Sequence, residues 1–226
     1  MGGSEATVDR VYDYWLGGRE NLRVDRELGK AIEERFPSVR DHVQAARKFC
    51  LRAASWCAGY GIERFACTGV AGWKPGLRNV HDAAREMAPR ARVAYVHRGR
   101  EAHAWARVLL GGRGLATARA DVNCPASLLA AGPVAALLGD GEPVALLLAM
   151  TLHFAPPEQA AEQVALYADA LPRGSALALC VALPDDSPEA DDLIRMFTPA
   201  RVYRHTAADV AGWVKAAGLE LAPPGV

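Results

Sequence analysis

Residues 63–95 constrain the fold most, because they read as strand, glycine-containing turn, helix and strand. Residues 64–68 and 92–96 are short apolar runs typical of strands. Between them, residues 77–88 carry apolar side chains at close to helical spacing. Together these segments predict one βαβ unit.

The turn after the first predicted strand contains Gly69 and Gly72. In a βαβ unit this turn lies at the carboxyl edge of the sheet, where glycines let the backbone approach a ligand. A Gly-x-x-Gly turn is by itself a weak signal, and a purely structural turn explains it equally well. The turn needs support from elsewhere in the chain.

Length and charge exclude several classes of partner. The 226 residues fit one domain with a sizeable core. Lys plus Arg, at 26, equals Asp plus Glu, at 26, so no net field attracts nucleic acid or anionic membrane. No block of basic residues alternates with aromatic residues as a single-strand binding surface would. We therefore expect a small-molecule substrate rather than nucleic acid or membrane.

The five cysteines are odd in number and scattered, which favours buried free thiols in a reducing cytosol. No Cys-x-x-Cys pair occurs, so no metal site is expected. The N-terminus has no apolar signal core, and the longest apolar run, residues 144–152, is too short to span a bilayer. A soluble, cytoplasmic protein is expected.

Residues 1–60 read as three helices, over about 7–16, 24–35 and 39–60. Because no strand precedes the sheet, they suggest a helical cap over one edge or over the ligand mouth. The pattern then alternates. Strands are expected near residues 64–68, 92–96, 115–119, 143–150 and 175–182, and helices near residues 77–88, 100–110, 125–131, 157–171 and 206–217.

This alternation predicts an α/β fold with a doubly wound, largely parallel sheet and right-handed crossovers. Residues 144–150 show no polar alternation, which suits a central strand covered on both faces. Residues 184–188 read as an acidic, exposed loop, and Thr206 with Asp209 resembles a capping box.

The string D-R-V-Y-D-Y-W-L-G-G-R-E-N-L at residues 9–22 is dense and unusual. It resembles the N-terminal signature of the actinobacterial S-adenosylmethionine-dependent methyltransferase family once catalogued as a domain of unknown function, which typically reads R-V-Y-D-Y-x-L-G-G-K-x-N-F-x-x-D-R. Further similarities follow in order at residues 78–82 (R-N-V-H-D), 120–122 (A-D-V) and 143–154, which end L-H-F. The resemblance covers about residues 8–222.

The resemblance implies a class I methyltransferase fold, with a helical cap over residues 1–60 and a Rossmann-like domain over residues 61–226 in one compact unit. It implies seven strands, the last antiparallel, and S-adenosylmethionine bound across the carboxyl ends of the first four. An acid ending the second strand usually binds the ribose, and one after the third approaches the adenine. The implied cofactor-binding residues are Tyr14, Asn21, Gly69, Gly72, His97, Asp121, Val122 and Met150.

The sequence departs from the family pattern where the cofactor would be held. Cys67 stands at the usual acid of the first strand, and His97 at the ribose-binding acid of the second. Bulky Trp73 and Lys74 enter a turn that is normally small. Neutral His97 supplies one acceptor to a diol, where a carboxylate accepts two bonds. The loss is worth about 2–4 kcal/mol, so we expect weakened cofactor binding.

His153 and Tyr14 are the candidate catalytic residues. His153 follows the central strand at the carboxyl edge, where it can act as a general base or orient a substrate. Its alternative role is a hydrogen-bonded histidine that caps the strand. Tyr14 and Asn21 are the ligand-facing pair by resemblance, and their alternative is simple packing in a lid. Cys67 can be a nucleophile or a packed thiol.

Two hypotheses follow. The chain is a small-molecule methyltransferase of secondary metabolism with weakened cofactor binding, or a repurposed methyltransferase fold that does not use S-adenosylmethionine. The second includes a cofactor-independent cyclase or lyase and a non-catalytic binding subunit. The family continues beyond the strand expected near residues 219–221 into a hairpin strand, so we expect an open sheet edge here and a possible homodimer.

Overall fold

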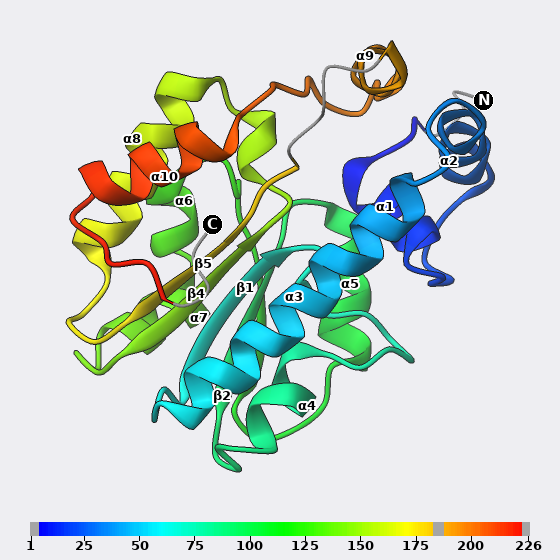
Figure 1. The fold of residues 1–226 in the computed structure, drawn as a ribbon. Helices are drawn as coiled ribbons and strands as arrows, with labels where there is room; N and C mark the ends of the chain where they lie inside the picture. The colour runs from blue at the N-terminus through cyan, green and yellow to red at the C-terminus, as the bar shows by residue number, and fades with distance from the viewer. Residues whose placement is uncertain (1–4, 183–187, 223–226) are drawn as a thin grey trace.

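A parallel sheet of five strands forms the centre of the computed structural model, which describes residues 5–182 and 188–222 (Figure 1). The strand order is β3-β2-β1-β4-β5, and every neighbouring pair is parallel. The strands are β1 (Arg64–Gly69), β2 (Arg92–His97), β3 (Leu115–Arg119), β4 (Val144–Ala149) and β5 (Ala176–Cys180). All five lie where the sequence predicts them, and β4 is buried along its whole length.

Helices cover both faces of this sheet. They are α1 (Val8–Trp15), α2 (Arg23–Arg35), α3 (Val39–Gly59), α4 (Val80–Arg85), α5 (Arg100–Leu109), α6 (Pro125–Leu129), α7 (Gly132–Leu138), the short 3-10 helix η1 (Leu152–Phe154), α8 (Pro157–Ala170), α9 (Pro188–Met196) and α10 (Ala207–Ala216). One core joins α3, α4 and α5 to one face of the sheet, and a second lies between the other face and α6, α7 and α8. Helix α10 packs beside α8 and against β5.

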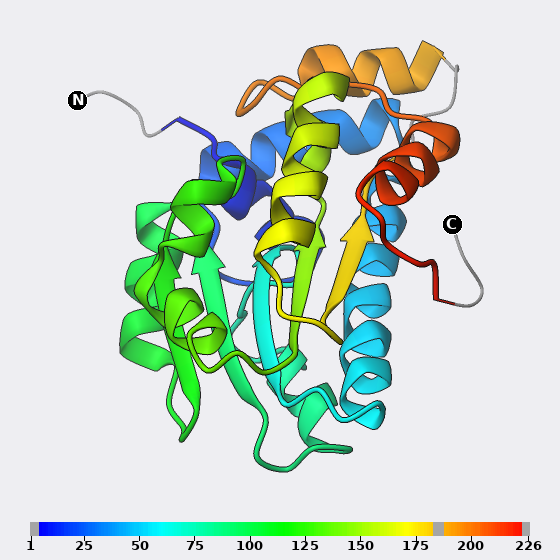
Figure 2. The ribbon, with the colours of Figure 1, turned by 90° about the vertical axis from the view of Figure 1, so that its left-hand side faces the viewer.

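The predicted N-terminal cap divides between two places in the fold. Helices α1 and α2 lie at the end of the sheet towards which the strand arrows point, as Figure 2 shows in blue. Helix α3 instead runs along one face of the sheet, where Cys50, Ala54 and Cys57 join the core that contains Phe65 of β1. The predicted division of the chain at residue 60 stays a prediction, and α3 belongs to the layer that covers the sheet.

Three local expectations from the sequence are corrected. The helix expected over residues 77–88 is shorter, because the capping box of Asn79 and Asp82 starts α4 at Val80. Helix α7 is not among the expected helices, and its Pro133 lies in the first turn, where proline is tolerated. Of the acidic loop predicted at residues 184–188, residues 184–187 lie outside the described part of the chain, and Pro188 begins α9.

The edge of the sheet also differs from the implied seven strands. Among residues 5–182 and 188–222 the sheet has five strands, none of them antiparallel, and residues 219–222 form no strand. Strand β5 is therefore an edge strand of the described sheet. The homodimer expected from an open edge stays a prediction. In the described residues, no helix is long and apolar enough to cross a bilayer.

We expect Leu147→Ala to lower the free energy of unfolding by about 2–5 kcal/mol, because Leu147 is fully buried in the central strand and its loss leaves a cavity. Urea denaturation measures this change. Leu166→Ala on the partly exposed face of α8 is the matched control, with an expected loss below about 1 kcal/mol. Equal losses at both positions would contradict a core centred on β4.

Candidate functional site

The turn after β1 opens the candidate site at the carboxyl edge of the sheet. Gly69 has a φ of +61°, and a Cβ there would lie 1.7 Å from the carbonyl oxygen of Ala149 at the end of β4. A Cβ on Gly72 would lie 2.9 Å from the carbonyl oxygen of Gly69. Both glycines are therefore required by close approach of the chain to itself, which is the structural reading of the Gly-x-x-Gly turn. Their contact with a cofactor stays a prediction.

Arg47 on α3 holds this turn in place from inside the protein. Its guanidinium donates to the carbonyl oxygens of Val70 and Gly72 at 2.7 and 3.1 Å. It also donates to the carbonyl oxygen of Arg78 and to Oδ1 of Asn79, at 2.8 and 3.0 Å. Burial lowers the pKa of Arg47, yet an arginine remains charged, so the turn is built around a buried cation. Sequence reasoning missed Arg47.

Lys74 turns inward from the same loop and forms a buried ion pair. Its ammonium lies 3.2 Å from Oδ1 of Asp13 on α1, and the Lys74 and Asp13 side chains are 11% and 1% exposed. The ammonium also lies 3.4 Å from the carbonyl oxygen of Asp9. Oδ2 of Asp13 accepts bonds from the backbone of Glu20 and the amide of Asn21, both at 2.8 Å. The pair joins the loop after β1 to the N-terminal helix.

Helix α1 lies over the carboxyl ends of the strands and contacts the turn after β2. Oδ2 of Asp9 accepts a bond from the backbone N–H of Gly99, in the turn after β2, at 2.7 Å. A hollow beside α1 has a volume of about 20 Å³. It is lined by Asp9, Arg10, Glu20, Trp73, Lys74, Pro75, Ala102 and Trp105. That volume holds about one water molecule.

His97, at the end of β2, is buried beside this closed hollow. Burial lowers the pKa of His97 to about 4. The Asp9 carboxylate raises this pKa, but by less than burial lowers it, and the nearby Lys74 and His103 lower it further. The imidazole is therefore neutral at pH 7. Among the residues the structure describes, none bonds to its Nε2 atom, so one polar atom of the side chain is buried without a partner. A Cβ on Gly72 would lie 3.7 Å from the His97 ring, which places the histidine next to the glycine turn.

His153 lies in η1 directly after β4 and is almost fully buried. Its Nε2 shares a hydrogen bond of 3.0 Å with the hydroxyl of Tyr12, and its carbonyl oxygen accepts a bond from the backbone of Tyr203. Burial and nearby His205 lower the pKa of His153 to about 3. A general base works best with a pKa near the working pH, so this geometry suits the strand-capping alternative better. A catalytic role for His153 stays a prediction.

Neither Tyr14 nor Asn21 forms a hydrogen bond with His153; both contact residues of the N-terminal region instead. The guanidinium of Arg40 stacks over the Tyr14 ring at 4.9 Å, and Gly29 of α2 leaves room for that ring. The Asn21 amide donates to Asp13 and to the carbonyl oxygen of Gly18, at 2.8 and 3.0 Å. These contacts are those of packing within the N-terminal helices. The structure brings Tyr12, rather than Tyr14, to His153.

The remaining candidates lie at the ends of β3 and β4. Asp121 is exposed, and its Oδ1 accepts a bond from the backbone of Asn123 at 3.0 Å. Val122 is buried in the core beside α6. Met150 is buried with a φ of 57°, in the left-handed region that side chains rarely adopt. Asp121 is thus the candidate whose carboxylate is open to solvent, and the roles of all three stay predictions.

Cys67 is fully buried in β1, and burial raises the pKa of its thiol well above the ordinary value. A neutral thiol is a poor nucleophile, so its surroundings suit the packed reading. Within the described residues, no group of three or more His, Cys, Asp or Glu side chains is placed to hold a metal ion.

Two residues missed by sequence reasoning left signals of different strength. Arg47 occupies the apolar stripe of α3, four residues after Val43 and three before Cys50, where a charge must find partners. Lys74 was recognised only as bulky for its turn. Its partner Asp13 lies about sixty residues earlier in the chain, and no local pattern connects the two.

The parallel sheet, the helices on both faces and the glycine turn after β1 define a Rossmann-like α/β protein. A profile of the S-adenosyl methyltransferase family matches residues 1–226, and the chain belongs to this family. A candidate methyltransferase from Thermobifida fusca YX is similar in structure, with a TM-score of 0.87 and 28% identity over 99% of this chain and 84% of that chain. A DUF574 family protein from Streptomyces avermitilis has a TM-score of 0.86 and 30% identity over 98% of this chain and 86% of that chain. None of the curated proteins matches the chain.

The family and the class I methyltransferase-like fold predicted from the sequence are therefore confirmed. Two features of the carboxyl edge bear on how the family cofactor would fit. The hollow of about 20 Å³ is far below the volume of about 300–1,000 Å³ that small-molecule sites enclose. S-adenosylmethionine carries a sulfonium and an ammonium, and the Lys74 ammonium already pairs with Asp13 where a cationic ligand would need an anion.

His97 and His153, two of the buried histidines, have lowered pKa values that predict a pH dependence of stability. In the unfolded chain each takes up a proton near pH 6.5, but in the folded protein only near pH 4 for His97 and pH 3 for His153. The unfolded state therefore binds more protons below pH 6.5, and the free energy of unfolding falls as the pH drops from 6.5 towards 4. The slope is up to about 1.4 kcal/mol per pH unit for each histidine.

Urea denaturation at pH 7, 6 and 5 measures this slope. The double variant His97→Asn, His153→Asn should show a shallower slope than the wild type, whereas His42→Asn at an exposed position should leave it unchanged. An equal slope in the double variant would show that other groups carry the pH dependence.

Proposed function

We propose that this chain is a methyltransferase-like protein that acts on a small molecule of secondary metabolism and binds S-adenosylmethionine weakly. Membership of the S-adenosyl methyltransferase family supports the activity class and the cofactor. The observation that carries the weakened binding is the buried Lys74–Asp13 ion pair at the edge where the family cofactor is expected. A cationic ligand must displace Lys74 from Asp13 before it can enter.

The free energy needed to displace Lys74 from Asp13 adds to the binding free energy lost where His97 replaces a carboxylate. Taking one partner from a buried ion pair leaves the other charge poorly compensated, which typically costs about 3–5 kcal/mol. Neutral His97 offers a ribose diol one acceptor, where a carboxylate offers more. Asp13 retains bonds from Glu20 and Asn21, so its carboxylate keeps its orientation when Lys74 leaves.

A second candidate function is favoured by the closed hollow itself. With a volume of about 20 Å³ between α1 and the loop after β1, the carboxyl edge can serve a repurposed fold that does not use S-adenosylmethionine. The alternatives are a cofactor-independent cyclase or lyase and a non-catalytic binding subunit. Fold membership does not decide between these candidates, because the residues that would decide are the altered ones.

Calorimetric titration with S-adenosylmethionine and S-adenosylhomocysteine separates the two candidates. For the wild type we expect a dissociation constant near the millimolar range. Lys74→Ala should bind at least about tenfold more tightly, because the hollow opens and Asp13 becomes available. His97→Asp should gain about 30-fold or more, because a carboxylate accepts two bonds from a diol where the neutral imidazole accepts one.

Lys48→Ala on the exposed face of α3 is the matched control for Lys74→Ala, and its affinity should equal that of the wild type. Micromolar binding by the wild type would contradict the weakened site. Failure of the wild type and of every folded variant to bind either compound would favour the repurposed fold.

A further inference from the structure

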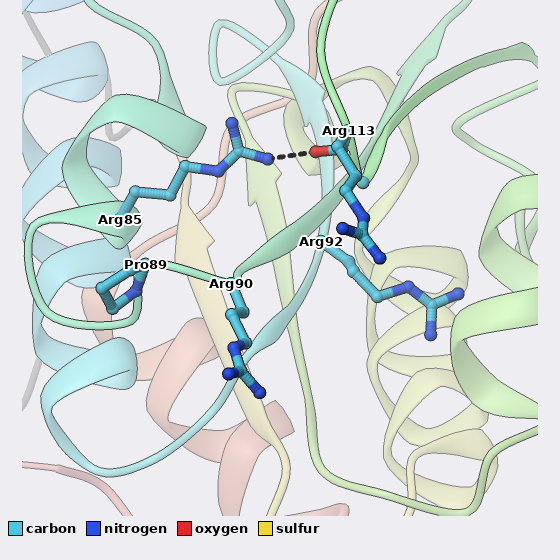
Figure 3. Close-up of a pocket in the computed structure, with 6 residues that line it drawn as sticks. Arg85, Pro89, Arg90, Arg92 and Arg113 are labelled. Atoms are coloured by element: carbon cyan, nitrogen blue, oxygen red, sulfur yellow. Dashed lines mark hydrogen bonds between the residues drawn. The ribbon is translucent and has the colours of Figure 1, made fainter.

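A second hollow lies at the opposite, amino edge of the sheet and is lined mainly by arginines. It encloses about 780 Å³ and is bordered by Arg85, Pro89, Arg90, Arg92, Arg113 and Gly114 (Figure 3). Its residues come from the end of α4, the loop before β2, the first residue of β2 and the turn before β3. We call it the arginine hollow.

The arginine hollow is separate from the candidate functional site. Arg92 begins β2 and His97 ends it, so the two sites lie at opposite ends of a six-residue strand. At about 3.3 Å per residue, the five steps from Arg92 to His97 separate them by roughly 17 Å. None of the residues that line the arginine hollow lines the closed hollow beneath α1.

One arginine of the hollow is fixed by the backbone. Arg85 donates from Nε and Nη2 to the carbonyl oxygen of Ala91, at 3.2 and 3.1 Å. Its Nη2 also reaches across to the carbonyl oxygen of Arg113 at 2.6 Å, the dashed contact in Figure 3. Arg85 therefore joins the loop before β2 to the turn before β3 and sets the shape of the hollow.

The charges of the hollow are only partly compensated. Arg92 pairs with Asp140 at 2.7 Å, but Asp140 also pairs with Arg64 at 3.2 Å, so two guanidiniums share one carboxylate. The guanidiniums of Arg90 and Arg113 form no hydrogen bond or ion pair with any residue in the described part of the chain. Both residues are exposed. Their donors are free to meet a ligand from solvent.

Planar guanidiniums with free paired donors recognise phosphate oxygens through two parallel bonds each. The volume lies within the range of small-molecule sites. No aromatic side chain lines the hollow to stack on a nucleic acid base, and the chain as a whole carries no net charge to attract a nucleic acid. These features favour a small ligand with several anionic oxygens.

We propose that the arginine hollow binds a diphosphate group, either as inorganic pyrophosphate or as the phosphate chain of a phosphorylated small molecule. Arg90 and Arg113 supply the free donors, and Arg92 supplies a further positive charge. Arg85 holds the loop before β2 and the turn before β3 in place. This site is independent of the cofactor question at the carboxyl edge, because it shares no residue with that site.

Calorimetric titration of the full chain with inorganic pyrophosphate tests the proposal, at constant ionic strength. Binding by the wild type should weaken at least tenfold in the double variant Arg90→Gln, Arg113→Gln. Both side chains are exposed and unpaired with described residues, so the variant should fold. Asp140→Asn should act in the opposite direction and tighten binding severalfold, because it removes the carboxylate that competes for Arg92.

The matched control removes two arginines elsewhere. Arg23→Gln, Arg195→Gln changes two exposed side chains on α2 and α9, 86% and 69% exposed, and should bind pyrophosphate as the wild type does. Titration with ADP distinguishes the sources: affinity equal to that of pyrophosphate supports a diphosphate carried by a larger molecule, and a much weaker affinity supports the inorganic ion. The proposal is overturned if millimolar pyrophosphate does not bind the wild type, if sulfate binds equally well, or if the Arg90, Arg113 variant binds as the wild type does.

Discussion

The buried ion pair between Lys74 and Asp13 controls how the carboxyl edge is built. Asp13 accepts bonds from Glu20 and Asn21 and faces Gly18, where a Cβ would lie 2.3 Å from Oδ1. The approach of Lys74 to Oδ1 has the distance of an ion pair but not the geometry of a hydrogen bond. The lysine therefore neutralises Asp13 without satisfying it fully. Oδ1 of Asp13 therefore keeps its acceptor capacity beside the lysine ammonium.

The N-terminal signature that identifies the family is largely used to hold the helices together. Arg10 and Asp25 form a buried ion pair of 2.7 Å, and Asp25 also accepts bonds from the backbones of Thr7 and Leu22. Asn21 bonds to Asp13, and Asp9 bonds to Gly99. A dense motif can therefore mark a fold reliably through the contacts that its polar residues make with the rest of the protein.

Features that depend on local sequence patterns were the ones that could be predicted. The strands were predictable because their apolar runs reflect burial on both faces of a parallel sheet, as in β4. The cap of α10 was predictable because Thr206 and Asp209 act within one turn, with the backbone of Asp209 3.1 Å from Oγ1 of Thr206.

The closed site was not predictable, because it depends on contacts between distant segments. Arg47 on α3 reaches four groups of the loop after β1, and Lys74 meets an acid about sixty residues earlier. The sequence motif for His97 indicated the loss of a carboxylate, but the burial that keeps its imidazole neutral arises only when β2, α1 and the glycine turn meet. The orientation of Tyr12 rather than Tyr14 towards His153 likewise required the tertiary structure.

The cationic side chains at the two edges of the sheet differ in burial, a difference that does not appear in the net charge of zero. At the carboxyl edge, buried Arg47 binds backbone carbonyls and buried Lys74 pairs with Asp13. Both charges are therefore compensated by groups of the protein itself. At the amino edge, Arg90 and Arg113 face solvent around an open hollow. An exposed guanidinium loses little solvation and keeps its donors for a ligand, whereas a buried one must be matched by the protein. The edge that the family fold assigns to ligands thus uses these two cations within the protein, and the opposite edge has guanidinium donors that pair with no described residue.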